Sequence, residues 1–261
     1  MLDAVILKSR EKDMLCVIDY KDEETKGKKV ILYKHGFMGH KITPHRMIVN
    51  VAHKLVEMGY TVVRFDCVGA GDSEGDCSYT TFKGELEDTL VTIKYIKENL
   101  KPEKFIILGY SMGGLITSLA SKFIESDGII LWSPVADPFY NFYHLLGEER
   151  FMKGLKGEDV DFNGDRVGKE FFVGMKNPEY QPLEAIKDYK KPVRIIHGTE
   201  DVDVPCINSI AYTEVVQDVK LHFVKGAGHG YDSVYYQDEL FDMTIKYVEE
   251  IMNKVKNSDE E

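Results

Sequence analysis

The chain contains a serine whose neighbours suit it to act as a nucleophile. Ser111 is the central residue of Gly109-Tyr110-Ser111-Met112-Gly113, which has the form G-x-S-x-G. The motif follows the apolar run FIILGY and precedes residues 114–124, which have the character of a helix. In this setting the chain turns so sharply from strand to helix that small residues must flank the serine, and its hydroxyl stands above the edge of the sheet. The pattern therefore predicts Ser111 as a nucleophile for attack on a carbonyl carbon.

A base must take the proton of the serine hydroxyl, and His229 is the candidate. It lies in residues 226–230 (GAGHG), a glycine-rich loop between the last predicted strand and the last predicted helix. Glycines on both sides let the imidazole project freely. In isolation this residue would be interpreted as an exposed loop histidine. In proteins with this kind of serine turn, the chain order is nucleophile, then acid, then histidine. The position of His229 fits that order, which favours its interpretation as the base.

The third member must be a carboxylate that lies between the nucleophile and the base and follows a strand. Residues 197–205 (HGTEDVDVP) contain three acidic side chains directly after an apolar run. A carboxylate here would accept a hydrogen bond from the imidazole and stabilise its cationic form. We select Asp201, although the pattern alone barely separates it from Asp203, and Asp137 is a more distant alternative.

Attack on a carbonyl produces an oxyanion, which requires hydrogen-bond donors. One donor is expected from the backbone N–H of Met112, directly after the nucleophile, and the other from a loop after an early strand. Residues 35–40 (HGFMGH) occupy that place, and their glycines allow the N–H of Phe37 to point into the site. We predict Phe37 and Met112 as the donors, with His35 at the start of the same loop as a substrate-binding candidate.

These residues need a sheet whose strands end beside one another. Eight short apolar runs predict its strands: residues 4–7, 14–20, 29–35, 60–66, 104–110, 128–132, 192–197 and 219–224. The first two are expected to form a β-hairpin. Apolar spacing and end signals such as Pro44 and Gly59 predict helices over residues 44–58, 80–100, 114–124 and 235–255. Strands that alternate with helices imply the α/β class, with a mostly parallel sheet of about eight strands and helices on both faces.

One segment, residues 133–189, breaks this alternation. It is rich in phenylalanine and tyrosine, is punctuated by glycines, and is longer than an ordinary loop. We interpret it as a cap or lid inserted into a core that comprises residues 1–132 and 190–261. Tyr140 and Tyr143 of the cap, and Trp132 at the end of the preceding strand, are candidate substrate-binding residues. The same aromatic residues would also pack the cap on the sheet.

The composition of the chain disfavours several classes of binding partner. Lys and Arg number 33 against 44 Asp and Glu, a net charge of −11, which disfavours nucleic acid and acidic membranes. The four cysteines lack metal-ligand spacing and fit free thiols in a reducing compartment. Without a signal-peptide pattern or an apolar stretch that could span a membrane, a cytoplasmic location without membrane insertion is expected. No metal or other cofactor is predicted, because the five-residue spacing of His35, His40 and His45 does not place them on one helical face. A homodimer is left open.

Together these motifs resemble those of the α/β-hydrolases over nearly the whole chain. HGFMGH, DCVGAGDS (residues 66–73), GYSMGG, HGTEDVDVP and GAGHG occur in the order that this superfamily has. HGFMGH and the compact length are similar to the bacterial feruloyl (cinnamoyl) esterases and related carboxylesterases. The resemblance implies the α/β-hydrolase fold with a cap inserted after the sixth core strand. It also implies Ser111, Asp201 and His229 as a catalytic triad and Phe37 and Met112 as the oxyanion donors.

We therefore predict a serine hydrolase that cleaves carboxylic esters of small molecules through an acyl-serine intermediate, of feruloyl or cinnamoyl esterase type and without a cofactor. The aromatic cap favours an apolar or aromatic acyl group. The triad motifs are also similar to those of monoacylglycerol lipases and prolyl-type aminopeptidases, so a lipase, a thioesterase or an aminopeptidase is the alternative. A hydrolase-fold binding protein without turnover is a rival from a different class.

Overall fold

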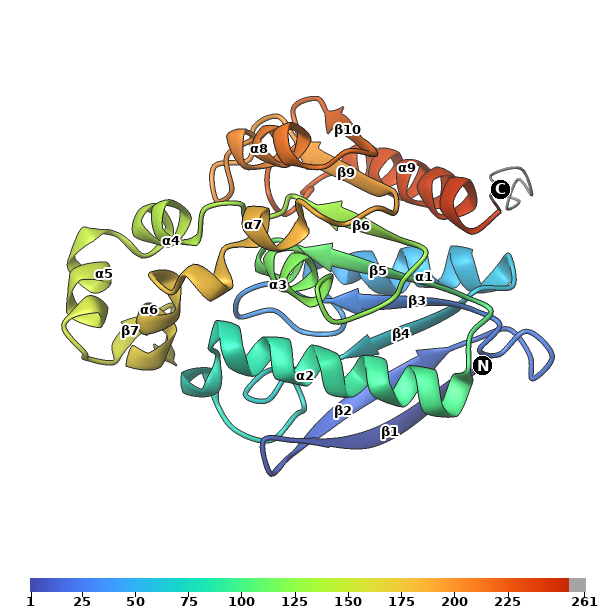
Figure 1. Ribbon diagram of the computed structural model, residues 1–261, viewed down its shortest axis with the longest axis horizontal. Coiled ribbons are helices and arrows are strands. Elements are labelled where there is room, and N and C mark those ends of the chain that lie inside the picture. The colour runs from blue at the N-terminus through green and yellow to red at the C-terminus, as the bar shows by residue number, and fades with distance from the viewer. Residues whose placement is uncertain (254–261) are drawn as a thin grey trace.

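The core of the protein is an eight-stranded sheet, and the computed structural model describes residues 1–253 (Figure 1). The strand order is β1-β2-β4-β3-β5-β6-β9-β10. β1 pairs antiparallel with β2, β2 pairs antiparallel with β4, and the remaining pairs are parallel. The predicted mostly parallel α/β sheet is therefore confirmed. The strands are β1 Leu2–Ser9, β2 Lys12–Asp19, β3 Lys29–Lys34, β4 Thr61–Phe65, β5 Lys104–Tyr110, β6 Gly128–Trp132, β9 Val193–Gly198 and β10 Val219–Val224.

Helices cover both faces of this sheet, which is why its central strands are almost wholly apolar. Along β3, Ile31 and Tyr33 face α1 (Met47–Glu57) and α9 (Val234–Met252). Val30 and Leu32 of the same strand face the opposite layer. That second layer contains α2 (Phe82–Tyr95), α3 (Met112–Ala120) and α8 (Ile207–Val215) (Figure 1).

The helices differ from their predicted ranges mainly at the ends. α3 begins at Met112, directly after the serine turn, rather than at residue 114. α2 continues into a π-helical turn over Ile96–Leu100. Residues 254–255 of the predicted last helix lie outside the described residues. α8 has no counterpart among the predicted helices, because its exposed Ile207 and Ile210 blur the apolar spacing of that segment.

The segment between β6 and β9 forms short helices and a small hairpin beyond the carboxyl ends of the central strands (Figure 1). We call residues 138–180 the cap segment. Its core is aromatic and includes the buried Phe142, Phe151, Phe171 and Phe172. The helix α7, which follows the cap segment, packs instead against α3 in the helical layer of the sheet. The elements are α4 Pro138–Leu146, α5 Glu148–Leu155, β7 Val160–Phe162, β8 Asp165–Val167, α6 Lys169–Met175 and α7 Pro182–Ile186.

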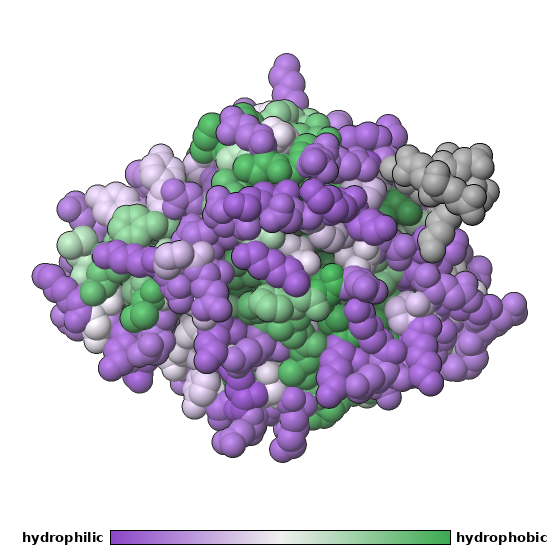
Figure 2. Space-filling model, in the orientation of Figure 1, coloured by the Kyte–Doolittle hydropathy of each residue, from purple (hydrophilic) through white to green (hydrophobic). Residues whose placement is uncertain are grey.

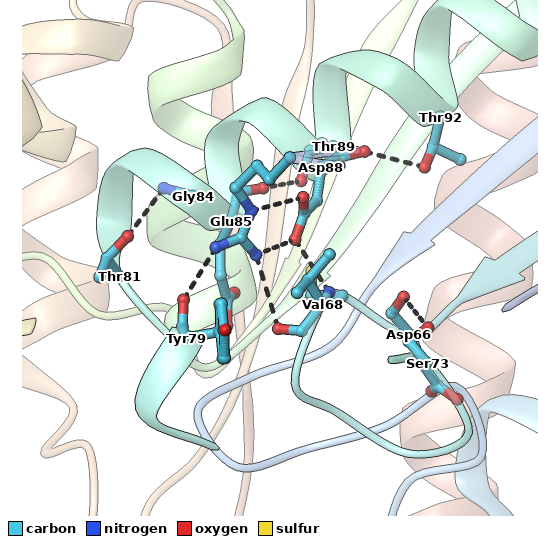
Figure 3. Close-up of polar contacts among 12 residues, drawn as sticks. Asp66, Val68, Ser73, Tyr79, Thr81, Gly84, Glu85, Asp88, Thr89 and Thr92 are labelled. Atoms are coloured by element: carbon cyan, nitrogen blue, oxygen red, sulfur yellow. Dashed lines mark hydrogen bonds and ion pairs between the residues drawn. The ribbon is translucent and has the colours of Figure 1, made fainter. Parts of the chain in front are cut away.

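A largely buried ion pair ties the β1–β2 hairpin to α2 (Figure 3). Arg10, in the hairpin turn, donates to both carboxylate oxygens of Asp88, from Nε at 3.0 Å and from Nη2 at 2.6 Å. Asp88 also accepts the backbone N–H of Val68 at 3.0 Å, and Arg10 Nη1 donates to the carbonyl of Tyr79 at 2.9 Å. The bidentate geometry offsets the loss of hydration that the two charges suffer on burial. Together with the bonds to Val68 and Tyr79, the ion pair holds the loop after β4 against α2.

Candidate active site

Ser111 occupies a strained turn between β5 and α3. Its backbone has φ 58° and ψ −125°, a conformation that residues other than glycine rarely adopt. Both glycines of the motif are required because other backbone atoms lie where a Cβ would stand. A Cβ at Gly113 would lie 2.2 Å from the carbonyl oxygen of Lys34, and a Cβ at Gly109 would lie 2.5 Å from that of Gly113. The surrounding backbone therefore fixes the sharp turn that projects the serine from the sheet edge.

Three residues that are distant in the sequence form a hydrogen-bonded relay. The Nε2 atom of His229 lies 3.0 Å from Ser111 Oγ, and its Nδ1 atom lies 2.7 Å from Asp201 Oδ2. Each partner sits on a loop or turn that follows the carboxyl end of a parallel strand: β5, β9 and β10. A relay of this geometry can remove the serine proton and stabilise the resulting imidazolium.

The surroundings of Asp201 suit a permanently charged carboxylate. Its side chain is fully buried, Oδ1 accepts the backbone N–H of Val204 at 2.8 Å, and His197 Nε2 lies 3.3 Å from Oδ2. Burial raises the pKa of Asp201, but hydrogen bonds from His197 and His229 outweigh this and hold it below the usual range. Asp203 is exposed and does not contact the imidazole.

The more distant alternative acid has another role. Asp137 accepts the backbone N–H of Tyr140 at 2.9 Å and caps the N-terminus of α4. Capping satisfies one of the helix's free N–H groups. The structure thus brings Asp201 to the histidine, and it leaves Asp137 at the start of the cap segment.

Tyr110 is a positioning residue that the sequence interpretation missed. Its hydroxyl donates to the backbone carbonyl of His229 at 2.7 Å, and the two rings stack with centroids 5.0 Å apart. Tyr110 directly precedes Ser111, so one stretch of chain positions both nucleophile and base. Its place inside the G-x-S-x-G motif was the signal that could have found it.

The two predicted oxyanion donors are both free to bind a ligand. Neither the N–H of Phe37 nor that of Met112 donates a hydrogen bond to any group within residues 1–253. Met112 is the first residue of α3, where helix N–H groups lack intrahelical partners. The carbonyl of Gly36 accepts from His35 Nδ1 at 2.8 Å and from the Gly39 N–H at 3.1 Å. Because a trans peptide sets C=O and N–H on opposite sides, these bonds orient the N–H of Phe37 away from them.

His35, which we predicted to bind substrate, lies beside Ser111 with its ring held by the backbone. The residue is 1% exposed and borders the site, but both ring nitrogens contact the backbone. Nε2 accepts the N–H of Cys67 at 3.1 Å, which leaves Nδ1 as the donor to Gly36. Lys34 Nζ donates to the carbonyl of His35 at 2.7 Å. These bonds fix the ring and the oxyanion loop around it, and contact between His35 and substrate stays a prediction.

We expect the stability of the protein to fall on acidification through this histidine. Burial holds the pKa of His35 well below its usual value, so the folded state keeps the ring neutral. The unfolded chain binds a proton below about pH 6.5, and the free energy of unfolding should therefore decrease below that pH, by up to about 1.4 kcal/mol per pH unit. Urea unfolding at about pH 5.5 and about pH 7.5 measures the effect. A His35→Asn variant with the same pH slope as the wild type would contradict this assignment.

Two cavities meet at Ser111, and Phe37, Met38 and His229 line both of them. The larger has a volume of about 570 Å³ and lies beneath the cap segment, between Phe142 and the loop after β9. The smaller has a volume of about 180 Å³ and lies under residues 35–44. A third cavity, of about 780 Å³, is lined mainly by charged side chains at the opposite end of β5 and contains none of these residues.

Asn141 of α4 is a site residue that the sequence interpretation missed. It is 2% exposed and lines the larger cavity, and its Oδ1 has no hydrogen-bond partner within the described part of the chain. Buried polar atoms are normally paired, so an unpaired amide oxygen among Phe142, Leu145 and Phe162 is suited to a hydrogen-bond donor of a ligand. No local signal could have found it, because an asparagine on a helix is uninformative until the face that it occupies is known.

The remaining predicted substrate-binding residues lie outside both cavities. Trp132 is fully buried between the sheet and α9, where its Nε1 donates to Thr244 at 3.0 Å, and this corrects the prediction that it touches substrate. Tyr140 is half-exposed and packs against His144. Tyr143 packs edge-on against Phe151 inside the cap segment. None of the three is among the residues that line the two cavities at Ser111.

The order of the sheet and the strained serine turn define the class of protein: the chain has the α/β-hydrolase fold. The family described as serine aminopeptidase S33 matches residues 25–154. The chain is 23% identical to Est1E from Butyrivibrio proteoclasticus in its structure with bound ferulic acid, with a TM-score of 0.80 over 96% of this chain and 100% of that one.

Two curated relatives carry names that describe ester cleavage. The lysophosphatidylserine lipase ABHD12 of Danio rerio is 30% identical over 191 residues, which cover 67% of this chain and 44% of the relative. Esterase EstD of Thermotoga maritima is 26% identical over 183 residues, 64% of this chain and 44% of that protein. The chain spans about half the length of the curated relatives it matches. Within residues 1–253, no helix has the length and apolar character that crossing a membrane requires.

Proposed function

We propose that this protein is a serine hydrolase that cleaves carboxylic esters, of the feruloyl or cinnamoyl esterase type. The observation that carries the proposal is the relay from Ser111 to His229 at 3.0 Å and from His229 to Asp201 at 2.7 Å. The unpaired N–H groups of Phe37 and Met112 support it, because acyl transfer needs donors at the developing oxyanion. The site needs no cofactor for this chemistry.

In the first half of the reaction, Ser111 Oγ attacks the ester carbonyl while His229 takes its proton. The carbonyl oxygen becomes an oxyanion that accepts hydrogen bonds from the N–H groups of Phe37 and Met112. His229 then gives its proton to the alcohol oxygen as the C–O bond breaks, and the alcohol leaves. In the second half, water gives a proton to His229 and attacks the acyl-serine, which releases the acid and restores Ser111. Asp201 stabilises the imidazolium in both halves.

The larger cavity supports an aromatic acyl group. Its volume of about 570 Å³ falls in the range of small-molecule sites, which are apolar with a few polar groups. Phe37, Phe142 and Phe162 supply aromatic walls, and Asn141 supplies a polar group among them. A hydroxylated cinnamoyl group matches this chemistry, and Est1E is a structural neighbour with ferulic acid bound.

A lipase is the second candidate, because the matched relative from Danio rerio is named a lysophosphatidylserine lipase. A substrate panel separates these proposals: methyl ferulate, p-nitrophenyl esters of increasing acyl length, a monoacylglycerol, lysophosphatidylserine, an acyl thioester and a proline aminoacyl amide. We expect methyl ferulate to have the highest kcat/KM. Preference for a lipid would favour the lipase. Preference for the thioester would indicate a thioesterase, and turnover of the amide alone would indicate an aminopeptidase. No turnover by folded protein would favour a binding protein.

Removing the amide of Asn141 is expected to reduce selectivity for a hydroxylated acyl group. In an Asn141→Leu variant, the ratio of kcat/KM for methyl 4-hydroxycinnamate to that for methyl cinnamate should fall about fivefold to tenfold, the worth of one neutral hydrogen bond. The two esters differ by one hydroxyl, so each serves as the control for the other. Equal losses on both would show that Asn141 shapes the cavity without binding the hydroxyl.

We also propose a reducing, cytoplasmic environment. All four cysteines are free, and Cys16, Cys67 and Cys77 are buried. Burial raises the pKa of the Cys16 thiol to about 12, so it stays protonated and unreactive. Fractionation of the source cells would test the location, and recovery of the protein only outside the cytoplasm would contradict it.

A further inference from the structure

The smaller cavity at Ser111 has its own polar group, the hydroxyl of Tyr33. Tyr33 is on β3, is fully buried, and lines this cavity together with Thr43, Tyr110 and the oxyanion loop. Its hydroxyl has no hydrogen-bond partner within residues 1–253. An unpaired hydroxyl at a cavity wall is a group that a ligand can satisfy, because leaving it unpaired costs free energy.

Tyr33 is also rigid and neutral. Its strand places it beside the Trp132 ring, with centroids 6.4 Å apart, in the close-packed core on the α1 and α9 face. Burial raises its pKa well above the usual value, so the hydroxyl stays protonated. A fixed hydroxyl of this kind can both donate to and accept from a hydroxylated ligand.

The two cavities divide an ester between them. Both open at Ser111 and His229, so the two substituents of a carbonyl held there point in different directions. The larger, aromatic cavity suits the acyl group, and the smaller one remains for the alcohol. At roughly 30 Å³ for each water in the liquid, a cavity of about 180 Å³ has room for on the order of six heavy atoms. That is the size of a three-carbon polyol.

We propose that the smaller cavity is the alcohol subsite and that Tyr33 selects a small hydroxylated alcohol there. The inference rests on the proposed function. The same position must admit the nucleophile of the second half-reaction, so a polyol can take the place of water. The polyol oxygen then gives its proton to His229 and bonds to the acyl carbon, the bond from that carbon to Ser111 Oγ breaks, and the proton passes to the serine. The product is a new ester.

Competition between two alcohols for the acyl-enzyme tests the proposed alcohol subsite directly. A p-nitrophenyl ester forms the acyl-serine in the presence of equal concentrations of glycerol and 1-propanol, and mass spectrometry gives the ratio of glyceryl to propyl ester. We expect Tyr33→Phe to lower this ratio about fivefold to tenfold, since it removes one hydrogen bond to the second hydroxyl. Because the ratio is set after acylation, it does not depend on the amount of active enzyme.

The controls separate this inference from the proposed function. Tyr189→Phe removes another buried hydroxyl, which pairs with Ser126 at 2.6 Å at the opposite end of the sheet, and should leave the ratio unchanged. Tyr33→Phe should be as stable as the wild type, because the lost hydroxyl has no hydrogen-bond partner in the described part of the chain. An unchanged ratio in Tyr33→Phe would overturn the inference and leave the esterase intact. Absence of Ser111-dependent p-nitrophenol release would overturn the proposed function and the inference with it.

Discussion

Replacing Ser111 with alanine is expected to abolish ester hydrolysis and to leave the fold intact. Without the hydroxyl, His229 has no proton to remove and no acyl intermediate can form, so kcat should fall by about a millionfold. The side chain contributes one hydrogen bond to the folded structure, at 3.0 Å to His229, so the melting temperature should change little. Initial rates with the best ester of the panel measure the effect, with circular dichroism as the check on folding.

Covalent labelling makes this prediction specific to one residue. A fluorophosphonate probe should label the wild type at Ser111 and should not label Ser111→Ala. Ser121→Ala is a matched control: Ser121 lies at the end of the same helix α3, where its hydroxyl donates to the carbonyl of Ser118 at 2.7 Å. That variant should keep both labelling and activity. Full activity in a pure Ser111→Ala preparation would refute the serine mechanism.

The second large effect is expected at the acid, where two candidates stand two residues apart. Asp201→Asn should lower kcat by about 10⁴, because an amide cannot stabilise the imidazolium and can favour the wrong tautomer of His229. Asp203→Asn should change kcat less than about threefold, since this exposed side chain has no contact with the imidazole. Kinetics of both variants with one ester decide between them. A larger loss in Asp203→Asn would contradict the relay.

Folding of the asparagine variant needs its own control. Asp201 Oδ1 accepts the N–H of Val204 at 2.8 Å, and the amide oxygen of asparagine can keep that bond. Fluorophosphonate labelling of Asp201→Asn should be slow but detectable, because Ser111 and the N–H donors remain in place. Loss of labelling together with loss of cooperative unfolding would mean that Asp201 acts on stability instead of catalysis.

Local pattern was sufficient for the sheet and for the candidates of the relay. Strands such as β5 and β6 are short apolar runs between turn signals, and a sheet covered on both faces requires such runs. The serine turn was likewise predicted from its local G-x-S-x-G pattern, although the structure shows that Gly113 is required by the distant strand β3 and only Gly109 by backbone within the motif. Chain order then placed a histidine and an acidic segment after it. The predicted fold is confirmed, and the roles of the individual residues await the experiments above.

Side-chain direction is what the sequence could not determine. Asp201 and Asp203 are equivalent in pattern, and only the path of the loop after β9 brings one of them within 2.7 Å of His229. Trp132 ends a strand beside the site, yet the pleat directs its ring into the core on the α9 side. Asn141 carries no motif at all.

The amino-acid sequence by itself thus determined the fold class, the serine turn and the order of the three candidate residues, because each depends on neighbours close in the chain or on composition. Tertiary structure alone decided which carboxylate meets the histidine, why His35 faces the backbone, and which unpaired polar groups line the two cavities. The physical reason is that hydrogen bonding and burial at such sites depend on residues that are far apart in the sequence, as Tyr33 and His229 are at the smaller cavity.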